Sequence, residues 1–453
     1  MALDKKPNNQ EKQLDRRSFL TYGAAAGAGL MMSGVAPERA AAAKQADDIN
    51  IALLGSGAQG QILMTSCLKI PGVRFKAVCD IWTDFNQKRA TGTLKKYGHD
   101  VSGYVDYREM LAQEQDLDAV IIATPDFWHA EHTIACLREG LHVYCEKEMS
   151  NSLAEARRMV VAARETGKLL QIGHQRRSNP RYIHCHENLL SDAQILGRIT
   201  TINAQWNRSV QPDLGWPQRY AIPPAVLSEY GFDSMHQFRN WRWYRGLGGG
   251  PIVDLGSHQI DIFGWFLDAM PQSVVASGGL DYYDAATHEW YDTVMAIYEY
   301  PSDKGVVRAF YQTLTTNGNQ GYYESFMGDQ GTLYITESAG RGGVYREQSA
   351  PDWRRWVELG YLDAPEEEAL SLDESLVLDV RETLAPPEHR IPVEFNDPYH
   401  MPHLVNFFKA VRGEEELNCP AEVGYESAVA VLKVNDAVER GTKLTFRQSE
   451  FRV

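Results

Sequence analysis

A glycine-rich stretch near the start of the chain is its most informative segment: residues 50–60 read Asn-Ile-Ala-Leu-Leu-Gly-Ser-Gly-Ala-Gln-Gly. The continuous apolar run over residues 50–54 predicts a buried parallel strand, and residues 61–70 have the composition of a helix start. A second predicted strand, residues 73–79, leads directly to Asp80, twenty residues after the last glycine of the turn. The order of strand, G-x-G-x-x-G turn, helix and strand predicts a dinucleotide-binding site.

Each glycine of this turn has a physical role in such a site. Gly55 permits the tight turn, Gly57 lets the backbone approach a pyrophosphate, and Gly60 lets the helix pack closely against the strand. Ala58 and Gln59 complete the turn and are expected to contact the cofactor, and the N–H groups and dipole of the following helix N-terminus favour phosphate. The alternative, a glycine-rich turn without a ligand, is disfavoured because both flanking strands and the acidic residue are in place.

Asp80 indicates which dinucleotide is bound. Its carboxylate would accept hydrogen bonds from the adenosine ribose hydroxyls and would repel a 2′-phosphate. We therefore expect NAD as the cofactor, with NADP less favoured.

Residues 1–43 do not have the composition of a folded domain. Arg16-Arg17 precede a moderately apolar, Gly- and Ala-rich stretch at 21–36, and Ala41-Ala42-Ala43 offer small residues for cleavage. This pattern resembles a twin-arginine export signal. A transmembrane anchor is disfavoured because the run is too short and too rich in Gly and Ala to span about 30 Å of hydrocarbon. We therefore expect a periplasmic protein that uses the twin-arginine export machinery and has no membrane partner after cleavage.

The predicted export route is consistent with the predicted dinucleotide site. Twin-arginine export carries folded proteins, and the dinucleotide is loaded in the cytoplasm. Since free NAD should be scarce outside the inner membrane, we expect the cofactor to be bound tightly and retained.

The composition limits the partners of the protein. The 453-residue chain has a formal net charge of −15, which argues against nucleic acid and anionic membranes. Its six cysteines include no C-x-x-C motif and no metal-ligand spacing. We expect mainly buried free thiols and no metal site.

The spacing of apolar segments predicts an α/β chain with two folded domains. Over residues 48–173, apolar strands alternate with helices, which predicts a doubly wound parallel Rossmann sheet for NAD binding. Residues 174–453 instead contain runs of alternating apolar and polar residues, which predict an α+β domain with antiparallel strands buried on one face. Beyond those already given, the predicted strands of the first domain are 117–123, 141–145 and 169–173, with helices at 132–139 and 152–166. The predicted strands of the second are 199–206, 273–278, 293–300, 306–314 and 332–336, with surface loops at 210–240 and 338–395 and helices at 403–412 and 425–439.

Several motifs in this order resemble the glucose–fructose oxidoreductase / inositol dehydrogenase (Gfo/Idh/MocA) family over residues 49–447. The motifs are the glycine turn, Ala123-Thr124-Pro125 with His129, Glu146-Lys147, residues 249–261 and residues 328–333. The resemblance implies a Rossmann domain followed by an open, mainly antiparallel sheet whose outer face mediates a homo-oligomer. It also implies oxidation or reduction of a sugar or cyclitol ring carbon.

The resemblance implies cofactor contacts from Thr124, Pro125, His129, Glu146 and Lys147, although a capping or packing role for His129 is nearly as well supported. One residue departs from the family pattern. The family has Glu-Lys-Pro, with a peptide bond that is often cis, whereas Glu148 stands here in place of the proline. The backbone geometry that holds Lys147 is therefore open.

Three residues carry the predicted chemistry. Taking a hydride from a secondary alcohol requires removal of the hydroxyl proton and stabilisation of the developing alkoxide. Asp254 and His258 are four residues apart on one helix face, where the carboxylate could orient the imidazole as general base. Lys147 follows a Rossmann strand and would polarise the reacting oxygen. The alternative for the Asp–His spacing is a structural hydrogen bond, and the other histidines supply too few ligands for a metal site.

Substrate contacts are predicted at the domain junction. Arg176 and Arg177 follow the last Rossmann strand, and Trp243 and Tyr244 precede the glycine run at 248–250. An interdomain salt bridge is an equal alternative for each arginine, and core packing is the main alternative for the tryptophan.

Together these features predict an NAD-dependent oxidoreductase acting on a secondary hydroxyl of a sugar or glycoside. Two other functions remain open from the sequence. One is a redox-neutral, NAD-dependent enzyme that cleaves a glycoside, and the other is a non-catalytic sugar-binding protein on the same scaffold.

Overall fold

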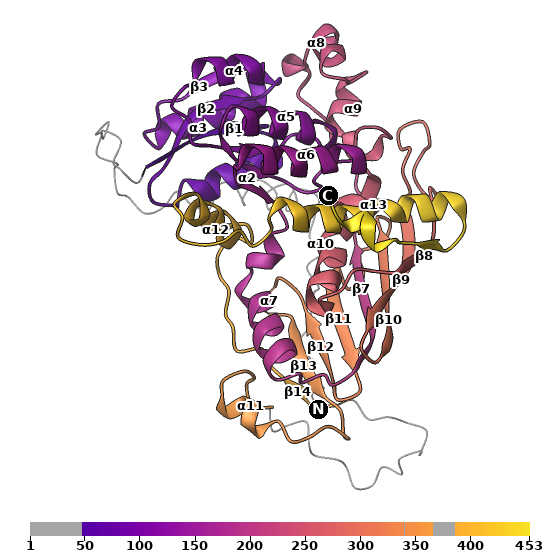
Figure 1. The fold of residues 1–453 in the computed structure, drawn as a ribbon. Coiled ribbons are helices and arrows are strands. Elements are labelled where there is room, and N and C mark those ends of the chain that lie inside the picture. The colour runs from indigo at the N-terminus through magenta and orange to yellow at the C-terminus, as the bar shows by residue number, and fades with distance from the viewer. Residues whose placement is uncertain (1–47, 339, 366–385) are drawn as a thin grey trace, which may run out of the picture. The chain divides into compact units, whose positions relative to one another are not determined.

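The computed structural model describes residues 48–338, 340–365 and 386–453 (Figure 1). The predicted export signal, residues 1–43, lies outside these residues. The described part of the chain contains two sheets, and the first occupies the N-terminal third (Figure 1).

The first sheet has six parallel strands in the order β3-β2-β1-β4-β5-β6, as the prediction of a doubly wound sheet requires. Every residue of β1 is buried, because helices cover both faces of the sheet. Its strands are β1 (Ile49–Leu54), β2 (Val73–Cys79), β3 (Ser102–Tyr104), β4 (Ala119–Ile122), β5 (His142–Cys145) and β6 (Leu170–Ile172). Its helices are α2 (Ala58–Cys67), α3 (Lys88–Lys96), α4 (Tyr107–Gln113), α5 (Asp126–Arg138) and α6 (Leu153–Thr166).

The order of the sheet reverses at β1, whose neighbours are β2 and β4. A crevice opens at the carboxyl ends of strands where a sheet reverses in this way, and ligands bind there. Helix α2 begins at Ala58, three residues earlier than predicted, so its N-terminus faces this crevice directly.

The second sheet has nine strands in the order β14-β13-β12-β11-β7-β10-β9-β8-β15. It is mainly antiparallel, as predicted, but β7 and β10 run parallel at its centre. Strands β11, β13, β14 and β15 were not predicted from the sequence. The strands are β7 (Ile199–Asn207), β8 (Ser273–Gly279), β9 (Thr293–Ser302), β10 (Gly305–Leu314), β11 (Tyr322–Gly328), β12 (Gly331–Ile335), β13 (Gly342–Arg346), β14 (Glu388–His389) and β15 (Leu444–Thr445).

Two long helices cover one face of the second sheet. Helix α10 (Gly250–Leu267) packs on β7 and β10, and α13 (Ala421–Arg440) packs on β8, α10 and α6 (Figure 1). Helix α12 (Met401–Val411) returns to the Rossmann domain and packs on α2. The C-terminal residues therefore connect the two sheets.

The predicted surface loop at 210–240 is wrong. This segment forms the short helices α8 (Pro224–Glu229) and α9 (Met235–Arg239), and four of its apolar side chains are buried in a cluster with Trp82 of the Rossmann domain. Those four side chains are Ile222, Leu227, Phe232 and Met235. Because they pack against a different domain, no periodic pattern within the segment reveals their burial. We call residues 218–243 the bridging segment.

The predicted loop at 338–395 is also wrong in its described parts, which contain β13, the helix α11 (Arg354–Glu358) and β14. Residues 339 and 366–385 lie outside the described residues. All six cysteines are buried and free, which confirms the prediction for them. Within the residues that the structure describes, no helix combines the length and hydropathy needed to cross a membrane.

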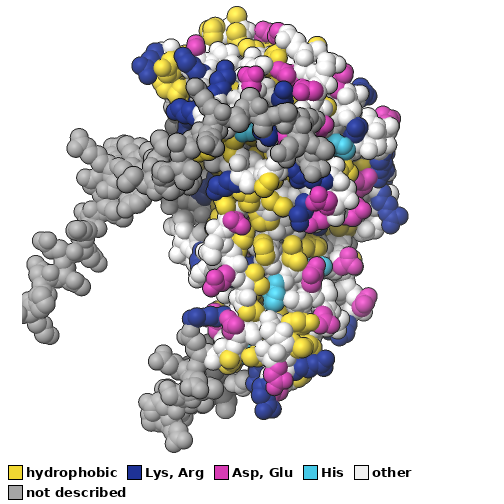
Figure 2. Space-filling view, turned by 90° about the vertical axis from the view of Figure 1, so that its left-hand side faces the viewer, with side chains coloured by type: hydrophobic (Ala, Val, Ile, Leu, Met, Phe, Trp, Pro, Cys, Tyr) yellow, Lys and Arg dark blue, Asp and Glu magenta, His cyan; other side chains and the backbone are white. Residues whose placement is uncertain are grey.

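Basic and acidic side chains are interspersed over the face of the molecule shown in Figure 2, and hydrophobic side chains run between them. No extended basic region is visible on this face.

Candidate active site

A cavity of about 780 Å³ opens where the first sheet reverses, and residues from both sheets line it. The carboxyl ends of β1, β2, β4 and β5 form one wall, and α10 and the end of β7 form the opposite wall. The cavity brings together most of the predicted cofactor-binding and catalytic residues. Those that line it are Gly55, Gly57, Ala58, Gln59, Asp80, Thr124, Pro125, Glu146, Lys147, Trp243, Asp254 and His258.

The glycine turn has the geometry of a dinucleotide loop. Gly55 has a φ of +82°, and a Cβ at this position would lie 2.6 Å from the carbonyl oxygen of Ala123. A Cβ on Gly60 would lie 2.0 Å from the carbonyl oxygen of Gly55, so only glycine lets α2 approach the turn. At Gly57 the nearest atom to such a Cβ is Nδ2 of Asn86 at 4.0 Å. The turn is therefore closely packed at Gly55 and Gly60 but has free space beside Gly57, which suits a pyrophosphate bound at the helix N-terminus.

Asp80 is built into this loop. Its Oδ2 accepts hydrogen bonds from the backbone N (2.8 Å) and Oγ (2.9 Å) of Ser56, and its Oδ1 accepts from the backbone N of Trp82 at 2.8 Å. Burial raises the pKa of the Asp80 carboxyl, whereas these hydrogen bonds favour its charged form. Each oxygen of a carboxylate can accept a further hydrogen bond, so Asp80 remains able to bind a ribose hydroxyl.

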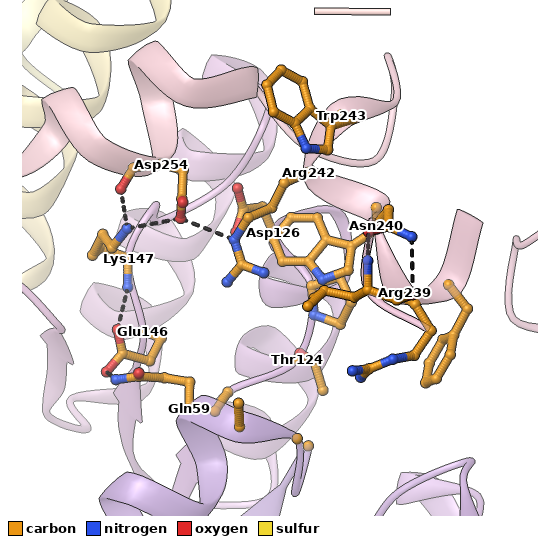
Figure 3. A pocket seen from close by; sticks show the side chains of 18 of the residues that line it. Gln59, Thr124, Asp126, Glu146, Lys147, Arg239, Asn240, Arg242, Trp243 and Asp254 are labelled. Atoms are coloured by element: carbon orange, nitrogen blue, oxygen red, sulfur yellow. Dashed lines mark hydrogen bonds and ion pairs between the residues drawn. The ribbon is translucent and has the colours of Figure 1, made fainter. Parts of the chain in front are cut away.

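Lys147 and Asp254 are in contact across the cavity (Figure 3). Lys147 Nζ donates to the backbone carbonyl of Asp254 and lies 3.2 Å from its Oδ1. The same Oδ1 accepts from Nε of Arg242 at 3.0 Å. Burial alone would raise the pKa of Asp254, but Lys147, Arg242 and Arg208 together hold it well below its usual range. Asp254 is therefore ionised and fixes two cations at the reacting end of the cavity.

The peptide bond between Lys147 and Glu148 is cis, although Glu148 is not a proline. The Glu148 side chain points away from solvent and is 1% exposed. Its backbone carbonyl lies 2.7 Å from Nδ1 of His129.

The predicted contact between Asp254 and His258 is wrong. No hydrogen bond or ion pair joins the two side chains in the described structure, because Asp254 is already occupied by Lys147 and Arg242. His258 Nδ1 is buried without a partner, and its ring packs 5.3 Å from the ring of Trp206. Burial, followed by the nearby cations, lowers the pKa of His258 well below its ordinary value. The imidazole in the cavity is therefore neutral at neutral pH.

Besides Gly60, which packs against the glycine turn, four other predicted site residues do not line the cavity. Arg176 is 1% exposed and forms ion pairs with Glu324 and Glu337, and Arg177 forms a bidentate ion pair with Asp261 at 2.8 to 3.0 Å. These are the salt bridges that the sequence left as the alternative for each arginine. The other two residues are Tyr244, which contacts His236, and His129, which contacts the backbone carbonyls of Thr124 and Glu148 behind the cavity wall.

Several residues that line the cavity were not predicted. They come from the start of α5, the end of β7, the loop after β8, the start of β11, the bridging segment and the turn before α12. None of them is a residue of the motifs quoted from the sequence. They include Asp126, Trp206, Arg208, Arg239, Arg242, Tyr283, Tyr322 and His400. His400 Nε2 lies 2.9 Å from Nε2 of Gln59, whose amide also donates to Glu146 at 3.0 Å.

The bridging segment is attached to the Rossmann domain on both sides of the cavity. On one side, Nε1 of Trp82 donates to the carbonyl of Tyr220, and the Arg239 guanidinium lies 5.3 Å from the Trp82 ring. On the other side, Nε1 of Trp128 donates to the carbonyl of Tyr230 at 3.2 Å. Residues of the segment, among them Tyr230 and Arg239, line the same cavity as Asp80, so the segment borders the expected adenosine end of the site.

Comparison with known proteins agrees with this architecture. Residues 49–174 match the family described as "Oxidoreductase family, NAD-binding Rossmann fold", and residues 189–334 match the "GFO/IDH/MocA C-terminal domain". The chain belongs to the Gfo/Idh/MocA family. This result confirms the resemblance that the motifs indicated.

Curated relatives of this Gfo/Idh/MocA chain are named dehydrogenases and reductases. It is 35% identical over 143 residues to 4-carboxy-2-hydroxymuconate-6-semialdehyde dehydrogenase from Sphingobium sp., a match that covers 32% of this chain and 44% of the relative. It is 29% identical over 193 residues to inositol 2-dehydrogenase from Salmonella paratyphi B, covering 42% of this chain and 53% of the relative. The chain thus spans about half the length of these relatives.

A similar fold occurs in the WlbA dehydrogenase from Bordetella pertussis, whose structure contains NADH and UDP-GlcNAcA. The two share 17% sequence identity and a TM-score of 0.65, over 88% of this chain and 98% of the other. At this identity the likeness describes the fold alone.

Proposed function

We propose that this protein oxidises a secondary hydroxyl of a sugar or glycoside, using NAD held by the glycine turn and Asp80. The observation that carries this proposal is the contact of Lys147 with Asp254 in the cavity that the glycine turn and His258 also line. An anion-binding loop, a fixed cation and a neutral imidazole are the groups that hydride removal from an alcohol needs.

The residues divide the chemistry between them. Gly55, Gly57 and Asp80 would hold NAD, which would supply the hydride acceptor for the carbinol carbon. Lys147, held by Asp254, stabilises the negative charge that develops on the substrate oxygen, and neutral His258 accepts the hydroxyl proton. Trp206, Tyr322 and Tyr283 offer aromatic faces on which the C–H face of a sugar ring can pack.

We propose further that the cofactor is retained during export to the periplasm. The support is the bridging segment, which is attached to the Rossmann domain beside Trp82 and beside Trp128. The adenosine end of a bound dinucleotide could leave only after these attachments open. The cofactor would then be loaded in the cytoplasm before twin-arginine export.

The first experiment uses the purified mature protein with no nucleotide added. The protein is denatured, the released nucleotide is identified, and native samples are offered sugars and glycosides while absorbance near 340 nm is followed. The proposal expects stoichiometric NAD and its reduction by one class of sugar. Protein without nucleotide, which no sugar reduces even after NAD is added, would leave sugar binding without catalysis as the function.

The role of the bridging segment is tested with Phe232→Ala. Phe232 is 2% exposed and its ring packs 5.5 Å from that of Phe127 on the Rossmann domain. We expect NAD dissociation to accelerate at least tenfold in this variant, while the matched change Phe446→Ala, also at a buried phenylalanine, leaves the rate unchanged. Equal rates in the wild type and Phe232→Ala would mean that the segment does not retain the cofactor.

Retention of the cofactor also favours a second candidate, a redox-neutral enzyme that cleaves a glycoside. Without a soluble NAD pool, the hydride must return to a second carbonyl substrate or to the same sugar after bond cleavage. Release of a free aglycone without net NADH would identify the second candidate.

We propose that the protein forms a homo-oligomer through the outer face of the second sheet. Three large apolar side chains are exposed on adjacent strands of that face: Val275 on β8 (40%), and Met295 (42%) and Ile297 (42%) on β9. Size-exclusion chromatography with light scattering tests this proposal, and Ile297→Lys should favour the monomer.

A further inference from the structure

Arg208 lines the cavity without an ion-pair partner among the described residues. It follows the last residue of β7, is half-buried, and its guanidinium carbon lies 5.3 Å from the ring of Trp206. Within the described residues, no carboxylate lies within ion-pair distance of this guanidinium, and the guanidinium donates no hydrogen bond. A planar guanidinium of this kind has five N–H donors available to a ligand.

The other cations of the cavity differ from Arg208. Lys147 and Arg242 share the carboxylate of Asp254. Arg239 donates to the backbone carbonyl of Gly215 at 3.2 Å. Lys147 and Arg242 are therefore neutralised by a carboxylate, whereas Arg239 is held over the ring of Trp82 on the Rossmann domain.

The carboxylates on this side of the cavity are also occupied. Glu337 lies 3.1 Å from Nη2 of buried Arg176. Asp213 lies 2.7 Å from Nε2 of His236 and 3.4 Å from Nε2 of His288. Neither of these carboxylates forms an ion pair with Arg208 in the described structure, so a negative charge beside its guanidinium can come from a ligand.

Arg208 lies at the reacting end of the cavity rather than at the nucleotide end. Its guanidinium and the His258 imidazole contact the same indole, that of Trp206, each at 5.3 Å. Arg208 also contributes to the low pKa of Asp254. A group bound to Arg208 would therefore lie beside the same indole as the base that takes the hydroxyl proton.

We propose that the substrate is an acidic sugar, such as a uronic acid or its glycoside, whose carboxylate pairs with Arg208. This inference rests on the proposed sugar oxidation and names its substrate class. A carboxylate fits the planar fork of one guanidinium in a bidentate manner.

The test compares matched pairs of methyl glycosides that differ only at C6, such as the β-D-glucuronide and the β-D-glucoside, with galacto and manno pairs beside them. For holoenzyme with its NAD, we measure binding by calorimetry and hydride transfer near 340 nm. A charge-assisted pair of this kind is worth roughly 10- to 100-fold in affinity. We therefore expect at least one uronide to bind and react about 10- to 100-fold better than its neutral partner.

Arg208→Gln should reduce this preference to about one. Arg208→Lys, which keeps the charge but loses the planar fork, should retain part of it. The matched control is Arg355→Gln, because Arg355 also lies over a tryptophan, Trp356 at 4.9 Å, but on exposed helix α11. This control should keep the full preference.

Three results would overturn the proposal: no uronide preferred in the wild type, equal losses for acidic and neutral partners in Arg208→Gln, or loss of bound NAD in that variant. The last result would assign Arg208 to the cofactor. If neutral and acidic sugars both fail to reduce the bound NAD, the proposed oxidation is wrong, and calorimetry still decides whether Arg208 selects a carboxylate.

Discussion

Glu148 provides a quantitative test of the structure through the pH dependence of stability. The side chain is 1% exposed, its Oε1 accepts from the backbone N of Met149 at 2.8 Å, and its Oε2 has no partner in the described structure. Burial raises the pKa of Glu148 from 4.5 to about 8. The folded protein therefore holds this carboxyl protonated at neutral pH, whereas the unfolded chain ionises it.

The sign of the effect follows from proton binding. Between the unfolded pKa near 4.5 and the folded pKa near 8, the folded state binds the extra proton. The stability associated with Glu148 is therefore complete below about pH 4.5 and is lost as the pH rises through about 8. Glu148→Gln, which cannot ionise, should avoid this loss.

The magnitude comes from the same shift. At about 1.36 kcal/mol per pKa unit, the free energy of unfolding of Glu148→Gln should gain on the wild type by about 1 kcal/mol at pH 5 and by about 5 kcal/mol at pH 9. Both figures are differences in the free energy of unfolding between Glu148→Gln and the wild type, after subtraction of the same difference at low pH. All other titrating groups cancel in this comparison because they are common to both.

The assay is urea denaturation of nucleotide-free protein at several pH values, followed by tryptophan fluorescence and circular dichroism together to check that the transitions coincide. The control is Glu358→Gln, at an exposed glutamate of α11, which should not change with pH relative to the wild type. A difference between Glu148→Gln and the wild type that is the same at pH 5 and pH 9 would refute the reasoning.

Three further perturbations test other parts of the structure. Lys147→Met should lower the rate of hydride transfer by about 10²- to 10³-fold, because the developing alkoxide loses its cation. The NAD content measured after denaturation should stay the same, and an unchanged turnover rate would show that Lys147 takes no part in the chemistry. Asp80→Asn should reduce the preference for NAD over NADP by about tenfold or more, because the carboxylate that repels a 2′-phosphate is removed. Fluorescence titration of nucleotide-free protein measures both affinities, and an unaltered ratio of the two would mean that Asp80 only holds the loop. Arg176→Met should lower the free energy of unfolding by about 3–5 kcal/mol, since it leaves the buried carboxylates of Glu324 and Glu337 without their cation, as urea denaturation would measure; a loss below about 1 kcal/mol would contradict a paired buried charge.

The nucleotide-binding half of this protein could be predicted from its amino-acid sequence alone. The glycine turn is a local property, because a positive φ at Gly55 and the lack of space for a Cβ at Gly60 exclude other residues whatever surrounds them. The parallel sheet was equally predictable, since strands buried on both faces read as continuous apolar runs. The motifs also placed Lys147, Asp254 and His258 correctly in one cavity.

The contacts that these side chains make depend on the tertiary fold and could not be predicted from the sequence. Helical spacing put Asp254 beside His258, but its carboxylate binds Lys147, 107 residues away, and Arg242. A carboxylate binds two cations in preference to a neutral imidazole, and no periodicity in the sequence reports which cations will be near. The same holds for the bridging segment and for Arg208. The apolar residues of the segment are buried against another domain. Arg208 is a candidate ligand-binding residue because the described fold brings no carboxylate within ion-pair distance of it.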